Sequence, residues 1–407
     1  MIIVAPSDPG MVEVDGVKTT LRSVVSSAKE GDTILLEDGV YTLPQAEEGQ
    51  YTGVYIKTPN ITLRSVRGDP KAVTIDAAYR GLGGQSGAIS IDAPGVVIAN
   101  IGVHRSIFHL VHLWSTAHDA ILHNLELVDG GQQFVKSSSG DGEIDGVQVS
   151  CSNFLMTDEG RDNVWGYGEQ GGTTACYTGG IDTHNSTNWT VRDNRFEGIY
   201  CDADGVQRPA HGMHPEMRGN MTYTGGLSEH AIHMWDSTEG SGHTLTRNLI
   251  LNCARGIGLG FVKEVYGSTI TNNMVFSSFP GSGAHDVGIS VERAIDTIVA
   301  HNTVYLSDPE SYGSGIEYRW SETSGLAMHG NLTNRKIRAR DGAQADLSEN
   351  IAEDAPAGWF VDAAAGELHL ADCAGPGPVS LHPDVELDFD GDEREDPTTP
   401  GADHCAE

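Results

Sequence analysis

Titratable side chains occupy corresponding positions in strand-like segments that lie far apart in the sequence. Each segment begins with an apolar residue, and the next residue is expected to point the opposite way, because side chains alternate across a β-strand. In three successive segments that next residue is Lys136, Asp182 and His233. His184 lies two residues beyond Asp182, so we expect it on the same side. A lysine, an aspartate and two histidines can exchange protons near neutral pH, which is acid–base chemistry.

The segments that carry these residues recur along most of the chain. Their first apolar residues form one expected inward column: Ile89, Val111, Val135, Ile181, Ile232, Ile257, Ile289 and Ile316. Most steps within it correspond to a repeating unit of roughly 22 to 27 residues, which is typical of solenoids. Two outward columns follow. The first consists of Ser90, His112, Lys136, Asp182, His233, Gly258, Ser290 and Glu317. The second lies two residues further along each segment and consists of Asp92, Trp114, Ser138, His184, Trp235, Gly260, Glu292 and Arg319. Because neighbouring coils lie about 4.8 Å apart, we expect Lys136, Asp182 and His233 to follow one another on one face.

Two arginines join the candidate catalytic residues on this face, because guanidinium groups can neutralise a substrate carboxylate. The full catalytic set is Lys136, Asp182, His184, His233, Arg218 and Arg255. The candidate substrate-binding residues flank this set, and they are His112, Trp114, Trp235, Glu229, His230, Glu292 and Arg319. An outward tryptophan can stack on a sugar ring or simply pack beneath a loop, and both interpretations stay open.

Histidines in one expected insertion are weak candidates for metal ligands. His211 and His214 lie three residues apart and, together with His184 and His233 from the face, would offer nitrogen ligands to one ion. The spacing alone is a weak indication, because residues three apart share a side on a helix and face opposite sides on a strand.

An acidic segment near the C-terminus matches a calcium-binding loop only in part. Asp388, Asp390 and Asp392 alternate as the ligands of such a loop do, which makes Ca²⁺ the cofactor that this pattern favours. The sixth position is not glycine, however, and no glutamate stands at the distal position. We therefore prefer the interpretation that residues 388–396 form a solvated acidic tail.

The composition restricts the partners of the protein. Its 407 residues carry a formal net charge of −32 at pH 7, which disfavours binding to nucleic acids and to anionic membranes. No run of about 20 apolar residues is present, so we expect no membrane-spanning segment. The six cysteines form no C-x-x-C motif, and we expect Cys176 to pair with Cys201 and Cys373 with Cys405. Such pairing favours a secreted or periplasmic protein, although no signal peptide is visible.

The chain is expected to divide into three parts. Residues 1–50 form an N-terminal cap, in which a short helix contains Leu21, Val24 and Val25. Residues 51–345 form the coils, with long insertions near residues 157–179 and 198–229, and long loops of this kind usually serve binding. Residues 346–407 form a C-terminal coil or cap and the acidic tail.

Asparagines recur three residues after an apolar residue, or after serine in the case of Asn153, and they predict how the coils turn. The series consists of Asn100, Asn124, Asn153, Asn194, Asn248, Asn273, Asn302 and Asn331. It resembles the asparagine ladder of β-helix proteins, in which asparagine tolerates a left-handed backbone and the stacked amides bond to one another. Over residues 18–370 the chain looks like a right-handed parallel β-helix protein, the architecture of pectate lyases, alginate lyases and chondroitinase B. The resemblance implies an all-β, single-stranded parallel β-helix with a short N-terminal capping helix.

The resemblance also implies a carbohydrate-active protein, most simply a monomer that acts on a polysaccharide or oligosaccharide. We expect a lyase that cleaves a uronate-containing polysaccharide by β-elimination, with Lys136 or His233 as the base. Similar alginate lyases use a lysine base and an arginine acid, but their complete motif is absent from this sequence. A glycoside hydrolase and a non-catalytic glycan-binding protein or adhesin are the alternatives. An open groove would favour an enzyme, whereas burial of these side chains would favour a structural role.

Overall fold

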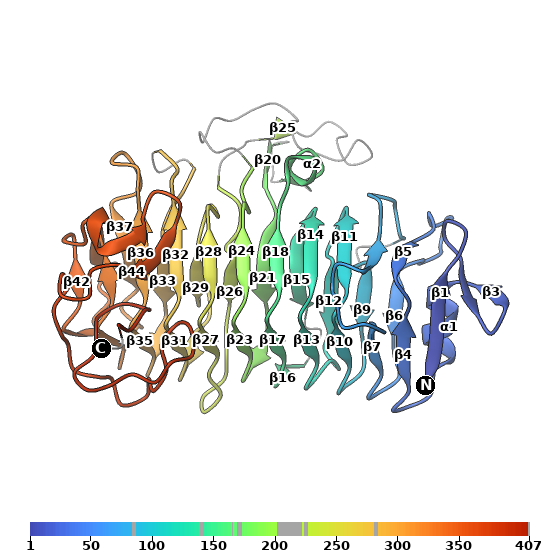
Figure 1. Cartoon of the computed structure of the whole chain (residues 1–407), viewed down its shortest axis with the longest axis horizontal. Coiled ribbons are helices and arrows are strands. Elements are labelled where there is room, and N and C mark those ends of the chain that lie inside the picture. The colour runs from blue at the N-terminus through green and yellow to red at the C-terminus, as the bar shows by residue number, and fades with distance from the viewer. Residues whose placement is uncertain are drawn as a thin grey trace. The chain divides into compact units, whose positions relative to one another are not determined.

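The structure, a computed structural model, describes residues 1–83, 87–138, 142–164, 166–168, 173–201, 222–223, 227–280 and 284–405. The chain forms two compact units. Unit 1 comprises residues 1–189 and 207–225, and unit 2 comprises residues 190–206 and 226–407. In the described residues, each unit is a right-handed, single-stranded parallel β-helix whose coils contribute one strand to each of three sheets, as predicted. Figure 1 shows the strands of each unit side by side.

The three sheets of unit 1 are built from consecutive coils. The first contains β1 (Ile2–Pro6), β4 (Thr33–Leu36), β7 (Thr62–Ser65), β10 (Val97–Ala99), β13 (Ile121–His123) and β17 (Gln148–Ser150), with β2 (Val12–Val14) and β3 (Val17–Thr19) added antiparallel at the edge. The second contains β5 (Gly39–Thr42), β8 (Val73–Asp76), β11 (Gly102–Ser106), β14 (Glu126–Gly130) and β18 (Asn153–Leu155). The third contains β6 (Val54–Ile56), β9 (Ile89–Ile91), β12 (Val111–Trp114), β15 (Gln133–Ser138) and β21 (Gly179–Thr183).

Unit 2 repeats this arrangement. Its first sheet contains β23 (Thr190–Arg192), β27 (Thr244–Thr246), β31 (Thr269–Thr271), β35 (Ile298–Ala300), β38 (Ala327–His329) and β41 (Asp346–Ser348). The second contains β24 (Arg195–Glu197), β28 (Leu249–Leu251), β32 (Met274–Ser277), β36 (Thr303–Leu306), β39 (Leu332–Thr333) and β42 (Ile351–Ala352). The third contains β26 (Ile232–Met234), β29 (Ile257–Leu259), β33 (Ile289–Glu292), β37 (Ser314–Arg319) and β40 (Lys336–Arg340).

Short elements decorate both units. In unit 1 these are α1 (Leu21–Ser27), α2 (Asp158–Arg161), the pair β16 (Ile144–Asp145) and β22 (Ser186–Thr187), and β19 (Gly166–Gly168), β20 (Thr173–Cys176) and β25 (Thr222–Tyr223). In unit 2 they are the pair β30 (Val265–Tyr266) and β34 (Ala294–Ile295), the 3₁₀ turn η2 (Ala357–Trp359), and the hairpin of β43 (Phe360–Asp362) and β44 (Glu367–Leu370).

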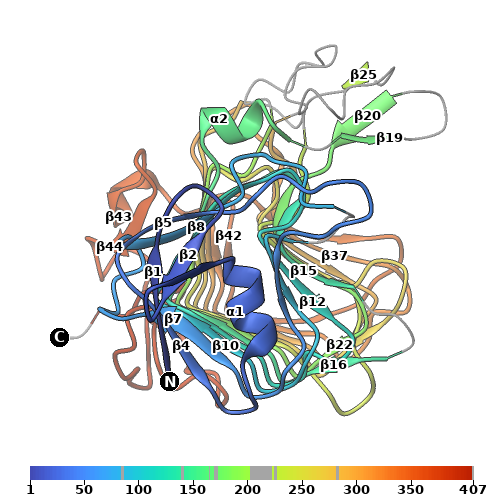
Figure 2. The same cartoon turned by 90° about the vertical axis from the view of Figure 1, so that its right-hand side faces the viewer.

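The predicted capping helix is α1. The side chain of Thr20 accepts a hydrogen bond from the backbone N–H of Ser23 at 3.1 Å, which satisfies one of the free amides at the start of the helix. Leu21, Val24 and Val25 are buried on the inner side, and Figure 2 shows α1 lying across the N-terminal end of the coils. The coils themselves begin earlier than residue 51, because β1 already pairs in parallel with β4.

The predicted inward column is confirmed in both units. In unit 1 the register joins Ile89, Val111, Val135 and Ile181, and in unit 2 it joins Ile232, Ile257, Ile289 and Ile316. All eight side chains have no exposed surface. Each coil therefore buries its apolar side against its neighbours, as solenoid coils do.

The long run of the asparagine ladder lies in unit 2. Successive side-chain amides are linked by hydrogen bonds of 2.8 to 3.0 Å from Asn194 through Asn248, Asn273, Asn302 and Asn331 to Asn350, a member that the sequence series omitted. We expected each asparagine itself to take the left-handed backbone conformation. This prediction was wrong for these residues, because the conformation lies at the residue before each asparagine, such as Arg247 before Asn248. In unit 1, Asn100 and Asn124 themselves take the left-handed conformation, and Nδ2 of Asn124 donates to Oδ1 of Asn100 at 2.7 Å. Asn153 bonds instead to the carboxylate of Glu126 at 2.9 Å, and the hydroxyl of Ser152 accepts from the amide of Leu125.

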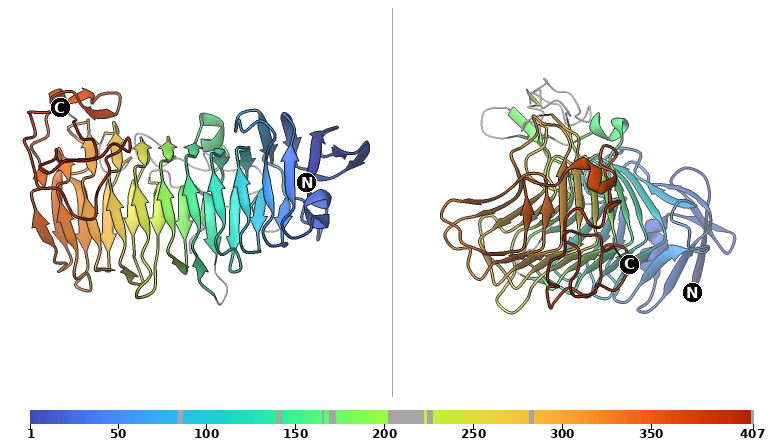
Figure 3. Two further views of the ribbon diagram at one scale, coloured as in Figure 1. Left: turned by 60° about the horizontal axis from the view of Figure 1, so that its bottom comes forward. Right: turned by 60° about the vertical axis from the view of Figure 1, so that its left-hand side comes forward.

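The prediction that residues 388–396 form a tail was wrong, although most of their side chains are exposed to solvent as expected. Figure 3 shows the C-terminal segment, in red, running over the coils of unit 2. The guanidinium of Arg394 is buried and donates hydrogen bonds to Asn272 Oδ1 at 2.9 Å and to the carbonyls of Gly401 and Ala402 at 2.8 and 2.7 Å. Burial lowers the pKa of Arg394 to about 10, so the group stays charged. The buried arginine thus fastens the acidic segment to the coils, together with bonds such as that from Nδ2 of Asn272 to the carbonyl of Leu387 at 2.8 Å.

The Arg394→Ala variant is expected to release this segment. Loss of the guanidinium group would leave several buried carbonyls without a hydrogen bond, at a cost of about 1–3 kcal/mol each. We therefore expect limited proteolysis within residues 376–400 to accelerate at least 10-fold. The matched control is Arg195→Ala, because Arg195 is exposed and pairs only with Glu197 in the second sheet of the same unit. Equal cleavage rates for the two variants would contradict the anchoring role.

The disulfide predicted between Cys373 and Cys405 is present, with the Cα atoms 5.7 Å apart. It closes the C-terminal segment of unit 2. A pairing of Cys176 with Cys201 would involve both units and stays a prediction. Across the described ranges, the helices are too short or too polar for any to cross a membrane.

Candidate functional site

The outward column of unit 1 lies in register, as predicted. Backbone pairing places Ser90, His112, Lys136 and Asp182 beside one another on successive strands of the third sheet. The Nζ of Lys136 donates a hydrogen bond to Oδ2 of Asp182 within an ion pair, and only 7% and 6% of these side chains are exposed. Nε2 of His184 lies 3.8 Å from the same Oδ2. These three predicted residues therefore gather, but around a buried ion pair.

Aromatic rings pack along β12, next to this ion pair. The ring of His112 lies 5.0 Å from that of His109 and 4.2 Å from that of Trp114, measured between centroids. Burial, with a smaller contribution from the charge of Lys136, lowers the pKa of His112 to about 4, so its imidazole is neutral at physiological pH. Buried, packed and neutral groups suit the structural interpretation of the unit 1 face better than the catalytic one.

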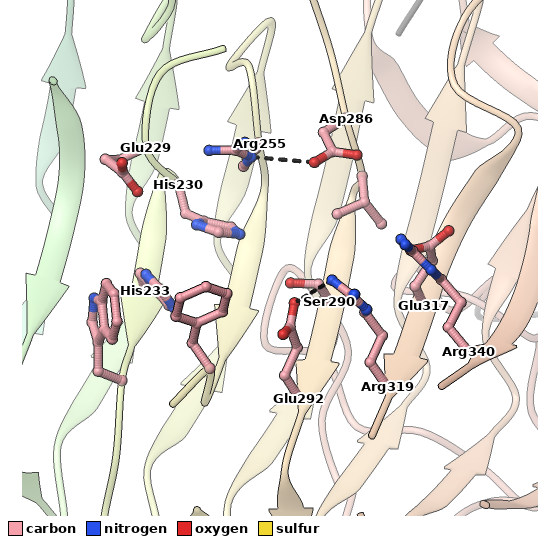
Figure 4. A pocket seen from close by; sticks show the side chains of 13 residues that line it. Glu229, His230, His233, Arg255, Asp286, Ser290, Glu292, Glu317, Arg319 and Arg340 are labelled. Carbon is pink, nitrogen blue, oxygen red and sulfur yellow. Dashed lines mark hydrogen bonds and ion pairs between the residues drawn. The ribbon is translucent and has the colours of Figure 1, made fainter. Parts of the chain in front are cut away.

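An open pocket of about 270 Å³ lies on the third sheet of unit 2 (Figure 4). Its residues come from β26, β29, β33, β37 and β40 and from the segments next to them. They are Glu229, His230, His233, Trp235, Arg255, Phe261, Asp286, Val287, Ser290, Glu292, Glu317, Arg319 and Arg340. Seven of these residues were predicted from the sequence, namely Glu229, His230, His233, Trp235, Arg255, Glu292 and Arg319. We call this site the unit 2 pocket.

Two imidazoles form one end of the unit 2 pocket. The rings of His230 and His233 are 4.5 Å apart between centroids. The carbonyl of Gly260 can only accept a hydrogen bond, and it lies 3.0 Å from Nε2 of His233, so this nitrogen carries a proton and Nδ1 is the ring atom left to act as a base or ligand. Burial, followed by the neighbouring His233 and Arg255, holds the pKa of His230 well below its usual range. His230 is therefore neutral and can act as an acceptor or a ligand.

Gly258 makes room for these imidazoles. A Cβ at Gly258 would lie 2.8 Å from Nε2 of His230 and 3.0 Å from Cδ2 of His233. The absence of a side chain at this outward position is thus what lets the histidines lie over the sheet. Gly260 has a φ of +69°, and a Cβ there would lie 1.8 Å from the carbonyl oxygen of Glu292, so this glycine lets the next strand approach.

Three arginines line the rest of the unit 2 pocket. Nη1 of Arg255 donates a hydrogen bond to the carbonyl of Ser228 at 2.9 Å, and its Nε lies 3.3 Å from Oδ2 of Asp286. Nη1 of Arg319 lies 3.5 Å from Oε1 of Glu292, and its Nε pairs with Asp341 at 2.7 Å. These guanidinium groups face the pocket next to carboxylates, as Figure 4 shows for Arg255 and Arg319.

The third arginine, Arg340, pairs with a buried carboxylate. Glu317 is 2% exposed, and it accepts hydrogen bonds from Nη1 of Arg340 at 2.8 Å and from the hydroxyl of Tyr312 at 3.0 Å. Burial, with the charge of Glu317 second, raises the pKa of Tyr312 to about 12, so the hydroxyl stays a donor. The sequence prediction missed Arg340 because it ended the strand series at Arg319, whereas β40 continues it and places Arg340 beside Arg319.

Aromatic side chains border the pocket beside the histidines. The ring of Trp235 lies 4.7 Å from His233 and meets the ring of Phe261 edge-on at 5.3 Å. Phe261 and the next residue, Val262, are 45% and 67% exposed. An exposed aromatic edge beside polar groups is the kind of surface on which a sugar ring can stack.

The structure does not test every predicted site residue. Arg218, His211 and His214 fall outside the described residues. The prediction that His233 follows Asp182 on one face concerns both units and stays a prediction.

The acidic segment forms no loop with three converging aspartates. The carboxylate of Asp388 accepts hydrogen bonds from the backbone amides of Asp390, Asp392 and His404, whereas Asp390 pairs with His369 at 3.1 Å. Asp388 and Asp390 thus face different partners, which does not fit a calcium loop. A ligand group of another composition, His369, Asp390 and Asp403, gathers at this end of unit 2.

Comparisons with known proteins give structural similarity only. No protein-family model matches the sequence, and no curated protein matches it. Similar solved structures include the pectate lyase Pel9A, with 12% identity and a TM-score of 0.47 over 96% of this chain and 84% of that one. An alginate lyase from Paenibacillus sp. str. FPU-7 has 14% identity and a TM-score of 0.37 over 73% and 94% of the two chains. The surface adhesin PfbA of Streptococcus pneumoniae has 10% identity and a TM-score of 0.38 over 81% and 86%. Similarity this low carries no conclusion about activity.

Proposed function

We propose that the protein is a polysaccharide lyase that cleaves a uronate-containing polysaccharide by β-elimination in the unit 2 pocket. The observation that carries this proposal is the presence of two histidines and of arginines in one open pocket. His233 and His230 lie at one end, and Arg255 and Arg319 also line it. A base and a cation are the two groups that an elimination next to a carboxylate requires.

His233 is the residue that we assign as the base. Elimination removes the proton from C5 of the uronate, forms the C4–C5 double bond and expels the oxygen linked to C4. The proton passes to Nδ1 of His233, while the Nε2–H holds the ring against the carbonyl of Gly260. The expelled oxygen is reprotonated by the pocket or by water, so the reaction needs no other reactant.

Arginine supplies the neutralising charge in this mechanism. A fork of two N–H groups on Arg255 or Arg319 matches the two oxygens of a uronate carboxylate, and this contact makes the C5 proton more acidic. Carboxylates also line the pocket, so a bound uronate would exchange places with Asp286 or Glu292. We therefore expect moderate affinity that falls at high salt concentration.

The proposal is tested with a panel of polysaccharides that contains polygalacturonate, alginate and a neutral glucan. A lyase is expected to produce ultraviolet-absorbing unsaturated ends from a uronate polymer and none from the glucan. New reducing ends without this absorbance would instead indicate a hydrolase, and binding without cleavage would indicate a glycan-binding protein. The site assignment fails if His233→Ala, which removes the proposed base of the unit 2 pocket, keeps full activity.

A further inference from the structure

We propose that Glu229, His230 and His233 form a binding site for a divalent transition metal such as Zn²⁺. One potential ligand atom from each of these residues lies within 4.8 Å of the others. Figure 4 shows the three side chains together at the histidine end of the unit 2 pocket. The cluster lies in a single unit and its residues belong to one short stretch of chain that leads into β26, so its geometry is local.

The orientation of His233 is the one that metal-binding histidines adopt. A metal-ligating imidazole usually donates its second ring N–H to a carbonyl or carboxylate, which fixes the tautomer. Nε2 of His233 makes this contact with the carbonyl of Gly260 at 3.0 Å. Gly260 is itself held to the neighbouring strand, because its N–H donates a hydrogen bond to the carbonyl of Met234 at 2.8 Å.

His230 supplies a second nitrogen ligand. Within the described part of the chain, its Nδ1 is buried and has no hydrogen-bond partner. A buried polar atom of this kind costs free energy unless a ligand satisfies it. The absence of a Cβ at Gly258 leaves room for the ring, because a Cβ there would touch both imidazoles. Small side-chain rotations would bring the ligand atoms from spacings of up to 4.8 Å to the closer spacing that a zinc ion requires.

The ligand types select the class of metal. Two imidazoles and one carboxylate suit Zn²⁺, Co²⁺ or Ni²⁺, whereas Ca²⁺ and Mg²⁺ prefer sites made of oxygen atoms. The three protein ligands leave a fourth position open toward the pocket, as in sites that also bind a small anion or water. One consequence rests on the proposed function: metal bound to Nδ1 of His233 would occupy the lone pair of the base, so Zn²⁺ would inhibit the lyase.

The test is isothermal titration calorimetry of the metal-free chain with ZnCl₂, in the presence of excess CaCl₂ and without any polysaccharide. We expect tight binding that Ca²⁺ does not displace, and His230→Gln should weaken it at least ~100-fold. His369→Gln is the matched control, because it alters the other ligand group of unit 2, and it should leave the binding unchanged. Titration with CoCl₂ should produce visible absorption bands in the wild type and lose them in His230→Gln.

The result that overturns the proposal is Zn²⁺ binding that is weak, displaced by Ca²⁺, or equal in the wild type and His230→Gln. Binding that disappears in His369→Gln but not in His230→Gln would place the metal at the C-terminal group and would also overturn it. Gly258→Ala provides a variant that keeps all three ligands, and its Cβ should weaken binding by displacing the rings. Circular dichroism checks that each variant is folded. Because no substrate is present, a failed lyase assay would leave this result unaffected.

Discussion

The His233→Gln variant is expected to lower kcat on the cleaved uronate polysaccharide by about 100- to 10,000-fold, since this is the usual contribution of a general base. Glutamine can still donate a hydrogen bond to the carbonyl of Gly260, so the local structure should persist. It has no basic nitrogen, however, and cannot take the C5 proton. The measurement is the initial rate of unsaturated product formation, in the presence of a chelator that removes transition metals.

Two comparisons decide whether this loss is chemical. KM should change far less than kcat, because His233 is assigned to proton transfer rather than to substrate binding. His369→Gln alters a different histidine of unit 2, which is half-buried and lies in the hairpin of β43 and β44. This variant should retain the wild-type rate. If His233→Gln keeps more than a tenth of the wild-type rate, the assignment of the base is wrong.

The Asn273→Ala variant is expected to lower the free energy of unfolding by about 3 kcal/mol or more, because each unsatisfied buried group costs about 1–3 kcal/mol. The side chain of Asn273 is fully buried. Its amide donates to the carbonyls of Leu245 and Thr271 and to Oδ1 of Asn302, and its own Oδ1 accepts from the N–H and the side chain of Asn248. Alanine offers no hydrogen bonds to replace those that these partners would lose. Equilibrium unfolding in urea measures the loss.

The ladder offers its own controls. Asn350 is the last member, is only partly buried and donates to a single carbonyl, that of Met328, so Asn350→Ala should cost less than Asn273→Ala. Asn163 in unit 1 makes one exposed hydrogen bond to the carbonyl of Glu159, and Asn163→Ala should be close to neutral. Equal costs at all three positions would show that the ladder does not stabilise the coils through its buried amides.

Local periodicity made most of the fold predictable. An apolar residue at the start of each strand has to face inward, so the alternation of the strand fixed both the inward column and the two outward columns. The asparagine pattern likewise predicted how unit 2 turns, although the left-handed residue is the neighbour of each asparagine. The pattern failed for the C-terminal segment, because the partners of Arg394, such as Asn272, lie more than a hundred residues away in the sequence.

The composition of the unit 2 pocket was predictable for the same reason. His233, Glu292 and Arg319 stand in the outward columns, and strand pairing makes such columns continuous. Arg340 was missed because the last strand of the sheet, β40, has mostly polar residues and gives no clear inward column. The significance of Gly258 was also missed, since only its distance from the imidazoles reveals that it makes room for them.

The sequence by itself determined the parallel β-helix, the side of the sheet on which each titratable residue stands, and the ladder that links the coils of unit 2. These features follow from alternation and repetition, which are local and can be read in one dimension. Only the tertiary structure decided that Lys136 and Asp182 are buried as an ion pair, whereas the residues around His233 border an open pocket. Burial depends on what packs above a side chain. No local pattern in the sequence specifies which groups pack above these residues.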